Sequence, residues 1–211
     1  MTAGKPRTIA ILGGAGALGS GLAARFVHAG HSVLIGSRDT TRASPVEGAA
    51  VLAHEDAARR ADIAFLTVPF AGQAEVLRLV AGAMAGKILI DATVPLVPPK
   101  VGRVQLPAEG SAAWISQALL GEGVRVVSAL QNVGALHLAH VGQPVDCDVL
   151  VCGDSIEARS EVIDLLSDIG LHGLHAGPLA NAAAAEALTS VLISINRFYK
   201  SDRAGIRITG I

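Results

Sequence analysis

Three glycines near the N-terminus stand at a spacing that could gather backbone N–H groups around a ligand. They occur in the run Gly14-Ala15-Gly16-Ala17-Leu18-Gly19, which fits G-x-G-x-x-G. The run follows an apolar stretch, residues 8–12, and opens a segment with helical spacing, which is the context that this motif requires. Its glycines permit a tight turn, a close backbone approach to a pyrophosphate and close helix–strand packing. Because the N–H groups of a helix N-terminus bind anions, the run predicts a dinucleotide site.

Hydroxyl and basic side chains follow the second expected strand. The order is Gly36-Ser37-Arg38, and Arg42 comes four residues later. An NAD site carries Asp or Glu at this point to bind the ribose 2′-OH. Here Ser37 can donate a hydrogen bond to a 2′-phosphate and Arg38 can form an ion pair with it, while the nearest acid, Asp39, lies beyond Arg38. The pattern favours NADP(H) over NAD(H), and ordinary charges in a solvated loop are the alternative.

Two further strand ends are expected near the same ligand. They read Thr67-Val68-Pro69-Phe70 and Ala92-Thr93-Val94-Pro95. Ligands of open α/β sheets bind outside the carboxyl ends of the strands, near the point where the strand order reverses. These loops should therefore approach the ribose and the nicotinamide. A proline that only ends each strand is an equally good interpretation.

No other group of reactive side chains follows a known catalytic pattern, and no catalytic residue is assigned. His137 and His140 could imitate a metal site with Asp146 or Cys147, but no established ligand spacing follows, so no metal is expected. Cys147 and Cys152 are too few for a disulfide framework. We interpret them as small apolar core residues.

The elements that must position these residues alternate between strands and helices. Apolar runs predict strands at residues 8–12, 32–36, 63–68, 87–92, 125–130 and 148–152. Helical spacing predicts helices at residues 18–29, 73–84, 111–120, 156–169 and 181–196. The alternation is typical of an α/β protein with a doubly wound parallel Rossmann sheet. We expect a dinucleotide-binding domain over residues 1–153 and a small C-terminal α/β or helical unit over residues 154–211, for the substrate cleft and dimerisation.

Composition excludes several other classes of protein. Of the 211 residues, 51% are hydrophobic and 17% charged, so a large core is expected rather than disorder. The net charge is −1, without the basic footprint of a nucleic-acid-binding protein. No uninterrupted apolar run reaches the ~18 residues of a membrane span, and the N-terminus does not read as a signal peptide. We expect a cytoplasmic protein with no nucleic-acid or membrane partner.

Blocks beyond the glycine run are shared with one known family. They include Leu66-Thr67-Val68-Pro69, Val127-Ser128-Ala129-Leu130, Val151-Cys152-Gly153-Asp154, Ala176-Gly177-Pro178-Leu179, Glu186-Ala187-Leu188-Thr189 and Ile193-Ser194-Ile195-Asn196-Arg197. On these blocks the chain resembles, nearly end to end, the coenzyme F420-dependent NADP oxidoreductases. The resemblance implies hydride transfer between NADP(H) and the deazaflavin F420, with stacked rings and no essential acid–base dyad.

The resemblance also implies roles for particular residues. Residues 15–18 would line the pyrophosphate. Ser37, Arg38 and Arg42 would bind the 2′-phosphate. Val68, with its neighbour Pro69, and Ala135 would lie near the cofactor.

Two segments depart from the family pattern. The family usually has His, then Thr or His, Ile or Val, and Pro or Ser, where this chain has Gln131-Asn132-Val133-Gly134. The resemblance places this segment beside the hydride-accepting ring, where amide side chains would suit a planar heterocycle with amide-like edges and Gly134 would leave room for it. The second departure is the stretch between Arg42 and Asp62, which is shorter than the family's helical insert.

Three functions therefore stay open. The first is hydride transfer between NADP(H) and F420. The second is NADPH-dependent reduction of another planar heterocycle, a pterin or a flavin. The third is a non-catalytic NADP-binding regulatory module. In each case we expect a homodimer, because the small apolar residues 182–187 predict a helix that packs closely on another element.

Overall fold

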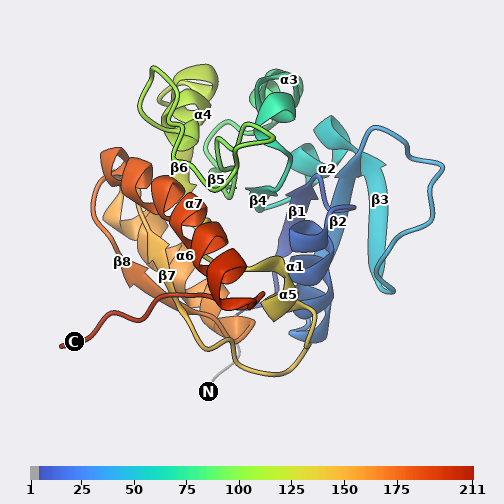
Figure 1. Ribbon diagram of the computed structural model, residues 1–211. Coiled ribbons are helices and arrows are strands. Elements are labelled where there is room, and N and C mark those ends of the chain that lie inside the picture. The colour runs from blue at the N-terminus through green and yellow to red at the C-terminus, as the bar shows by residue number, and fades with distance from the viewer. Residues whose placement is uncertain (1–4) are drawn as a thin grey trace.

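The computed structural model describes residues 5–211, and its main layer is a six-stranded sheet (Figure 1). The strands are β1 (Thr8–Leu12), β2 (Ser32–Ser37), β3 (Ala49–Ala53), β4 (Ile63–Leu66), β5 (Ile88–Asp91) and β6 (Arg125–Ser128). They lie in the order β3-β2-β1-β4-β5-β6, and all pairs are parallel. The strand order reverses between β1 and β4, which places the expected ligand crevice at their carboxyl ends. The predicted doubly wound α/β fold is confirmed.

Helices cover both faces of this sheet. They are α1 (Ala17–His28), α2 (His54–Arg60), α3 (Phe70–Val80), the short 3-10 helix η1 (Ala81–Ala83), α4 (Ala112–Leu120) and α5 (Ala135–Leu138). Successive strand residues point to opposite faces. Ile9 and Ile11 of β1 therefore enter the core that contains Phe26 of α1, whereas Ala10 enters a second core with Leu77 of α3. Burial on both faces explains why these strands read as continuous apolar runs.

A second, smaller sheet holds the C-terminal part of the chain. Its elements are β7 (Asp148–Val151), α6 (Ile156–Asp168), β8 (His172–His175), the 3-10 helix η2 (Leu179–Asn181) and α7 (Ala182–Tyr199). The expected strand at residues 148–152 forms, but it pairs with β8 and touches β6 only through an antiparallel bridge between Ser128 and Cys152. The boundary expected after residue 153 stays a prediction, and it falls inside this β7–α6–β8 unit.

Apart from the 3-10 helix η2, four short elements lie outside the sequence expectations. They are β3, α2, α5 and β8, of five, seven, four and four residues. β3 and α2 occupy most of the shortened stretch between Arg42 and Asp62, so this stretch completes the sheet edge. α5 follows Gly134 and contacts α1.

The segment Leu179–Tyr199 is one helix that is long and apolar enough to cross a membrane by length and composition. Its most apolar window has a mean hydropathy of 1.3 and is 33% buried. Ala182, Ala185 and Glu186 are buried at its N-terminal end, and α7 contacts α4. One such helix is weak evidence for a membrane, because a helix that packs in a globular domain passes the same test.

Candidate active site

The glycine run forms the turn between β1 and α1. Gly13, one residue before the motif, takes the positive φ of 93° that the turn needs. A Cβ on Gly19 would lie 2.6 Å from the Cα of Gly14 and 2.8 Å from Oγ1 of Thr67, so this glycine lets α1 lie directly on the strand ends. Gly16 is the N-cap of α1, and the first turn of α1 holds no acidic residue.

The middle of this turn is open to solvent. Ala15, Gly16 and Ala17 are exposed, whereas Leu18 is half-buried. A Cβ on Gly16 would meet only the carbonyl oxygen of Gly13, at 3.7 Å. The N–H groups of the first helical turn have no partner within the helix. The turn therefore presents an uncrowded donor surface of the kind that accepts a pyrophosphate.

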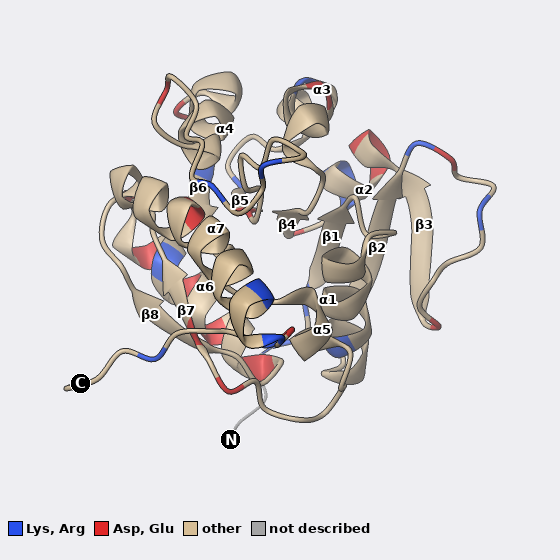
Figure 2. Cartoon of the chain, viewed as in Figure 1, with Lys and Arg blue, Asp and Glu red and all other residues tan. Residues whose placement is uncertain are grey.

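The end of β2 carries two exposed guanidinium groups. Oγ of Ser37 donates a hydrogen bond to the carbonyl oxygen of Asp39, at 2.9 Å. The Asp39 carboxylate accepts from the N–H and the hydroxyl of Thr41, which lowers the pKa of Asp39. Within residues 5–211, the guanidinium groups of Arg38 and Arg42 have no hydrogen bond or ion pair. Figure 2 shows basic and acidic positions alternating along this loop between β2 and β3.

His54 is a residue at this end of the sheet that the sequence did not single out. It is the first residue of α2 and is 6% exposed. A Cβ on Gly36 would lie 2.8 Å from Nδ1 of His54, so the ring occupies the space beside that glycine. Burial, together with the charge of Arg38, lowers the pKa of His54. The buried imidazole therefore favours its neutral form near the charge of Arg38.

The end of β4 closes the turn on its other side. A Cβ on Gly13 would lie 2.6 Å from Cγ1 of Val68, and Oγ1 of Thr67 donates to the carbonyl oxygen of Leu12 at 3.1 Å. Pro69 is exposed and is the N-cap of α3. Val68 is half-buried against the glycine turn, so the structure brings Val68 and Pro69 together with the dinucleotide motif.

A network of buried polar groups lies at the ends of β5 and β6. Asp91 is fully buried, and its carboxylate accepts from Nε2 of Gln73 at 2.9 Å and from Oγ of Ser116 at 2.5 Å. Nε2 of Gln131 donates to the backbone carbonyl oxygen of Asp91 at 2.7 Å. The backbone carbonyl oxygen of Gln131 in turn accepts from the hydroxyl of Thr189 at 2.7 Å. Gln131 is thus tied both to the sheet and to α7. Its Oε1 has no hydrogen-bond partner among the described residues.

The rest of the expected ring-binding segment is used largely inside the protein. Asn132 is 1% exposed, and its amide donates to the carbonyl oxygen of Asp148 at 2.6 Å, which links β6 to β7. Val133 is 7% exposed. Gly134 and Ala135 are half-buried at the start of α5, where Gly134 is the N-cap. Of the four residues, only Gln131 retains an unpartnered acceptor. The room expected at Gly134 is not there, because a Cβ on Gly134 would lie 3.3 Å from Cδ2 of His137 on α5.

Comparison with known proteins identifies the family. A family model described as "NADP oxidoreductase coenzyme F420-dependent" matches residues 8–95. The F420-dependent NADP reductase of Methanothermobacter thermautotrophicus is 39% identical, over 96% of this chain and 95% of its own length. That of Methanocaldococcus jannaschii is 37% identical, over 96% and 98%. The chain belongs to the F420-dependent NADP reductase family.

A solved structure agrees with this membership. It comes from Arthrobacter sp. FB24, and its name proposes an F420-dependent NADP-reductase. It superimposes on this member of the F420-dependent NADP reductase family with a TM-score of 0.83 and 26% identity, over 97% of this chain and 100% of that one. The two-sheet architecture described above is therefore shared along the whole chain.

Glu186 is a second residue of the site region that sequence reasoning missed in this F420-dependent NADP reductase family member. It lies on α7, is 1% exposed, and accepts from the N–H groups of Ala112 and Ala113 at 2.7 and 3.0 Å. Burial, with a contribution from the charge of Asp91, raises the pKa of Glu186 to about 7. The sequence signal was a lone acid within an Ala-rich helix, which does not reveal that the partner is the N-terminus of α4.

The histidines and cysteines considered as possible metal ligands form no reactive cluster among the described residues. Nε2 of His137 lies 3.2 Å from the carbonyl oxygen of Arg203, and His140 is exposed. Cys147 and Cys152 are buried free thiols, and burial raises the pKa of Cys152 to about 11. Across residues 5–211, no group of three or more His, Cys, Asp or Glu side chains could hold a metal ion.

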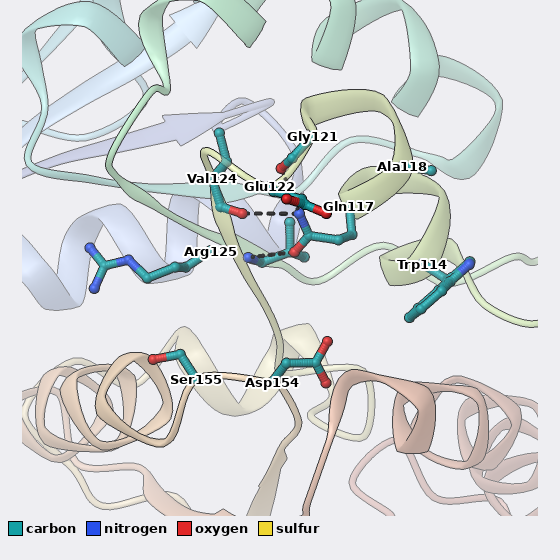
Figure 3. Close-up of a pocket in the computed structure, with 10 residues that line it drawn as sticks. Trp114, Gln117, Ala118, Gly121, Glu122, Val124, Arg125, Asp154 and Ser155 are labelled. Atoms are coloured by element: carbon teal, nitrogen blue, oxygen red, sulfur yellow. Dashed lines mark hydrogen bonds between the residues drawn. The ribbon is translucent and has the colours of Figure 1, made fainter.

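A separate pocket lies at the opposite end of β6 from Gln131. Its volume is about 540 Å³, and Trp114, Gln117, Glu122, Arg125 and Asp154 are among the residues that line it (Figure 3). The amide of Gln117 is used internally, since it donates to the carbonyl oxygens of Gly121 and Val124. Because ligands of this fold bind at the carboxyl ends of the strands, we do not assign the pocket to the coenzyme site.

Proposed function

We propose that this protein transfers a hydride between NADP(H) and coenzyme F420. The observation that carries the proposal is 37–39% identity, over nearly the full length of both chains, to enzymes named F420-dependent NADP reductase. The open glycine turn and the two unpaired guanidinium groups support the NADP(H) part independently.

We assign the binding residues from the geometry of the strand ends. The exposed backbone at Ala15, Gly16 and Ala17 would bind the pyrophosphate at the N-terminus of α1. Arg38 and Arg42 would pair with the 2′-phosphate, as planar guanidinium groups do. Ser37 would contribute its hydroxyl to the same phosphate after exchanging its bond to Asp39. Val68, Pro69 and Ala135 would surround the cofactor beyond the pyrophosphate.

The protein's part in the chemistry is orientation. When bound, NADP(H) and F420 supply the hydride-donating and hydride-accepting rings. Gln131 holds a buried, unpartnered Oε1 at the end of β6, and a polar ring edge could donate to it once a local movement of the surrounding segment exposes it. The bonds of Gln131 to β5 and α7 hold that amide in place. A fixed ring-binding segment lowers the entropic cost of stacking two rings.

The proposal is tested by mixing the purified protein with NADPH and F420 and following the F420 absorbance. A dihydropterin, free flavin and a no-acceptor mixture run in parallel, and NADH replaces NADPH in a second series. Turnover that needs both NADPH and F420 is the expected result. Turnover only with a pterin or a flavin would show that this ring, and not F420, is the hydride acceptor. NADPH binding without any turnover would favour the regulatory module.

We further propose that the enzyme is a homodimer whose contact includes α7. Along this helix Val191, Ile195 and Phe198 are 45%, 39% and 80% exposed, which is unusual for so many large apolar side chains on one helix. The unit over residues 154–211 would then serve both dimerisation and the ring-binding cleft. A second copy of the chain would cover this apolar surface.

We also propose that the protein acts in the cytoplasm on small molecules, without a nucleic-acid or membrane partner. Both cysteines are free thiols, as in reducing compartments, and the net charge of −1 provides no electrostatic attraction to nucleic acid. Recovery in the membrane fraction at physiological salt would contradict the location.

A further inference from the structure

Arg25 is a buried arginine whose guanidinium hydrogen bonds all go to backbone carbonyl oxygens. It lies on α1, six residues after Gly19 of the glycine run, and is 2% exposed. Its Nε donates to the carbonyl oxygen of Leu138 at 3.0 Å. Its two terminal nitrogens donate to the carbonyl oxygens of Gln143, Ile169, His137 and His140, at 2.7–3.0 Å. All five N–H donors of the guanidinium are thus used on backbone carbonyls.

Four of these five carbonyls belong to one short segment, residues 137–143. The segment contains a single helical turn, α5, followed by turns without regular structure. A helix of four residues cannot hold its own shape in water. The position of α5 therefore depends on bonds from outside the segment, and Arg25 supplies the largest set of them. Burial lowers the pKa of Arg25, but the carbonyl acceptors favour the charged guanidinium.

A second observation on the same helix points to the same contact. Gly21 lies one turn before Arg25, and a Cβ on Gly21 would come within 2.7 Å of Cβ of Leu138. α5 is therefore pressed against the backbone of α1 at Gly21 and bonded to it at Arg25. The two contacts fix both the distance and the rotation of α5 relative to α1.

This arrangement joins the two ends of the proposed coenzyme site. The N-terminus of α1 carries the turn assigned to the pyrophosphate. Gly134 and Ala135, at the start of α5, belong to the segment assigned to the ring end. We infer that Arg25 is a positioning residue for hydride transfer, which sets the ring-binding segment at a fixed distance from the pyrophosphate-binding turn. The inference rests on the proposed function, because it concerns the same site.

The test separates the two halves of the coenzyme. The affinities of NADPH and of 2′,5′-ADP, which lacks the nicotinamide half, are measured for wild type, Arg25→Lys and Gly21→Ala. A lysine ammonium has three donors and no planar fork, so it cannot satisfy five carbonyls. Gly21→Ala keeps the arginine but pushes α5 away. Arg59→Lys, an exposed substitution on α2, is the control.

We expect both variants to bind 2′,5′-ADP like wild type, to lose part of the extra affinity that NADPH has over it, and to lose about 10- to 100-fold in rate, since a misplacement near 1 Å has rate effects of this size. With F420 as acceptor, kcat should fall while KM for F420 changes less, and the primary isotope effect with NADPH deuterated at the transferred position should rise. Arg59→Lys should match wild type in every measurement.

Equal losses for 2′,5′-ADP and NADPH would overturn the inference, because they indicate general destabilisation. Wild-type affinity and kcat in both variants would overturn it as well. If Arg25→Lys does not fold, Gly21→Ala decides the question, since it displaces α5 while the arginine stays in place. If the wild type does not reduce F420, the proposed function fails, and the inference about Arg25 is then decided by the binding measurements alone.

Discussion

At the scale of single residues, the proposed coenzyme end of the site carries two guanidinium groups, Arg38 and Arg42, that have no ion pair among residues 5–211. Asp39 is the nearest acid in sequence to Arg38 and Arg42. Its carboxylate is bonded to Thr41, and the charge of Arg42 also lowers its pKa without a direct ion pair between them. The two guanidinium groups are thus available to an external anion, and an NAD-type carboxylate is missing from the end of β2. Specificity for the 2′-phosphate should therefore respond to a single substitution.

Arg38→Ala should weaken NADPH binding much more than NADH binding. A hydrogen bond to a charged group contributes about 1.5–3 kcal/mol, which corresponds to about 10- to 100-fold in Kd. Titration of both cofactors by fluorescence or calorimetry measures the difference. Arg59→Ala, which removes an exposed arginine paired with Glu55 and Asp56, is the matched control. Equal losses of NADPH and NADH affinity would refute the assignment of Arg38.

Glu186 should make the stability of the protein depend on pH. Its pKa is raised from 4.5 to about 7 in the folded protein, so the folded state binds more protons than the unfolded state between these values. The stabilisation from Glu186 is therefore fully present below about pH 4.5 and is lost as the pH rises through about 7.

Comparison of wild type with Glu186→Gln isolates this effect, because the amide does not titrate. The free energy of unfolding of wild type, measured with urea from pH 5 to pH 8, should fall relative to the variant, by at most about 3 kcal/mol. Parallel curves for the two proteins would show that Glu186 is ionised throughout.

At the scale of elements, the site is assembled where helices approach strands without intervening side chains. α1 reaches the ends of β1 and β4 only because Gly19 has no Cβ. α7 bonds to the end of β6 through Thr189 and to the N-terminus of α4 through Glu186, so this C-terminal helix links two elements of the main sheet layer. The loop between β5 and α4 also packs on α7, through hydrogen bonds from Ser190 and Ser194.

Gly19→Ala should destabilise the protein and weaken NADPH binding together. The new Cβ would meet backbone at 2.6 Å, and overpacking of this kind costs about 1–3 kcal/mol. The control is Gly72→Ala in α3, where a Cβ would meet nothing within 4 Å. That change should leave binding intact and stabilise the fold by about 0.5–1 kcal/mol. Thermal unfolding and NADPH titration of both variants check the prediction, and a neutral Gly19→Ala would contradict it.

At the scale of the whole molecule, the exposed apolar residues of α7 call for a partner surface. The helix is held at its N-terminal half by α4, while its C-terminal half presents Ile195, Phe198 and Tyr199. Scattered apolar side chains are normal on protein surfaces, but a contiguous row along one long helix is typical of an interface.

The homodimer is tested by light scattering on wild type and on Ile195→Asp. Wild type should have twice the chain mass of 21.4 kDa at micromolar concentration, and the aspartate should shift it toward the monomer because a buried unpaired charge is costly. Leu79→Asp on α3, at a residue that is 50% exposed and remote from α7 in sequence, is the control and should stay dimeric. A monomeric wild type would contradict the proposed homodimer.

The sequence by itself determined the features that depend on neighbouring residues. The glycine spacing, the serine and arginine after β2 and the apolar runs predicted the Rossmann sheet, its order of elements and the kind of coenzyme, because turns, helices and buried strands follow local patterns. Short elements escaped this reasoning. β3 has only five residues, and α5 is a single turn whose place depends on Arg25.

Only the tertiary structure decided which distant segments meet. Arg25 and its partners are separated by 112 to 144 residues. Glu186 lies 74 and 73 residues from Ala112 and Ala113, whose N–H groups donate hydrogen bonds to it. Likewise, the apolar run of β7 does not reveal that its partner is β8 rather than the main sheet. Such pairings depend on chain geometry and on the burial of whole faces, which residue types and spacing do not encode locally.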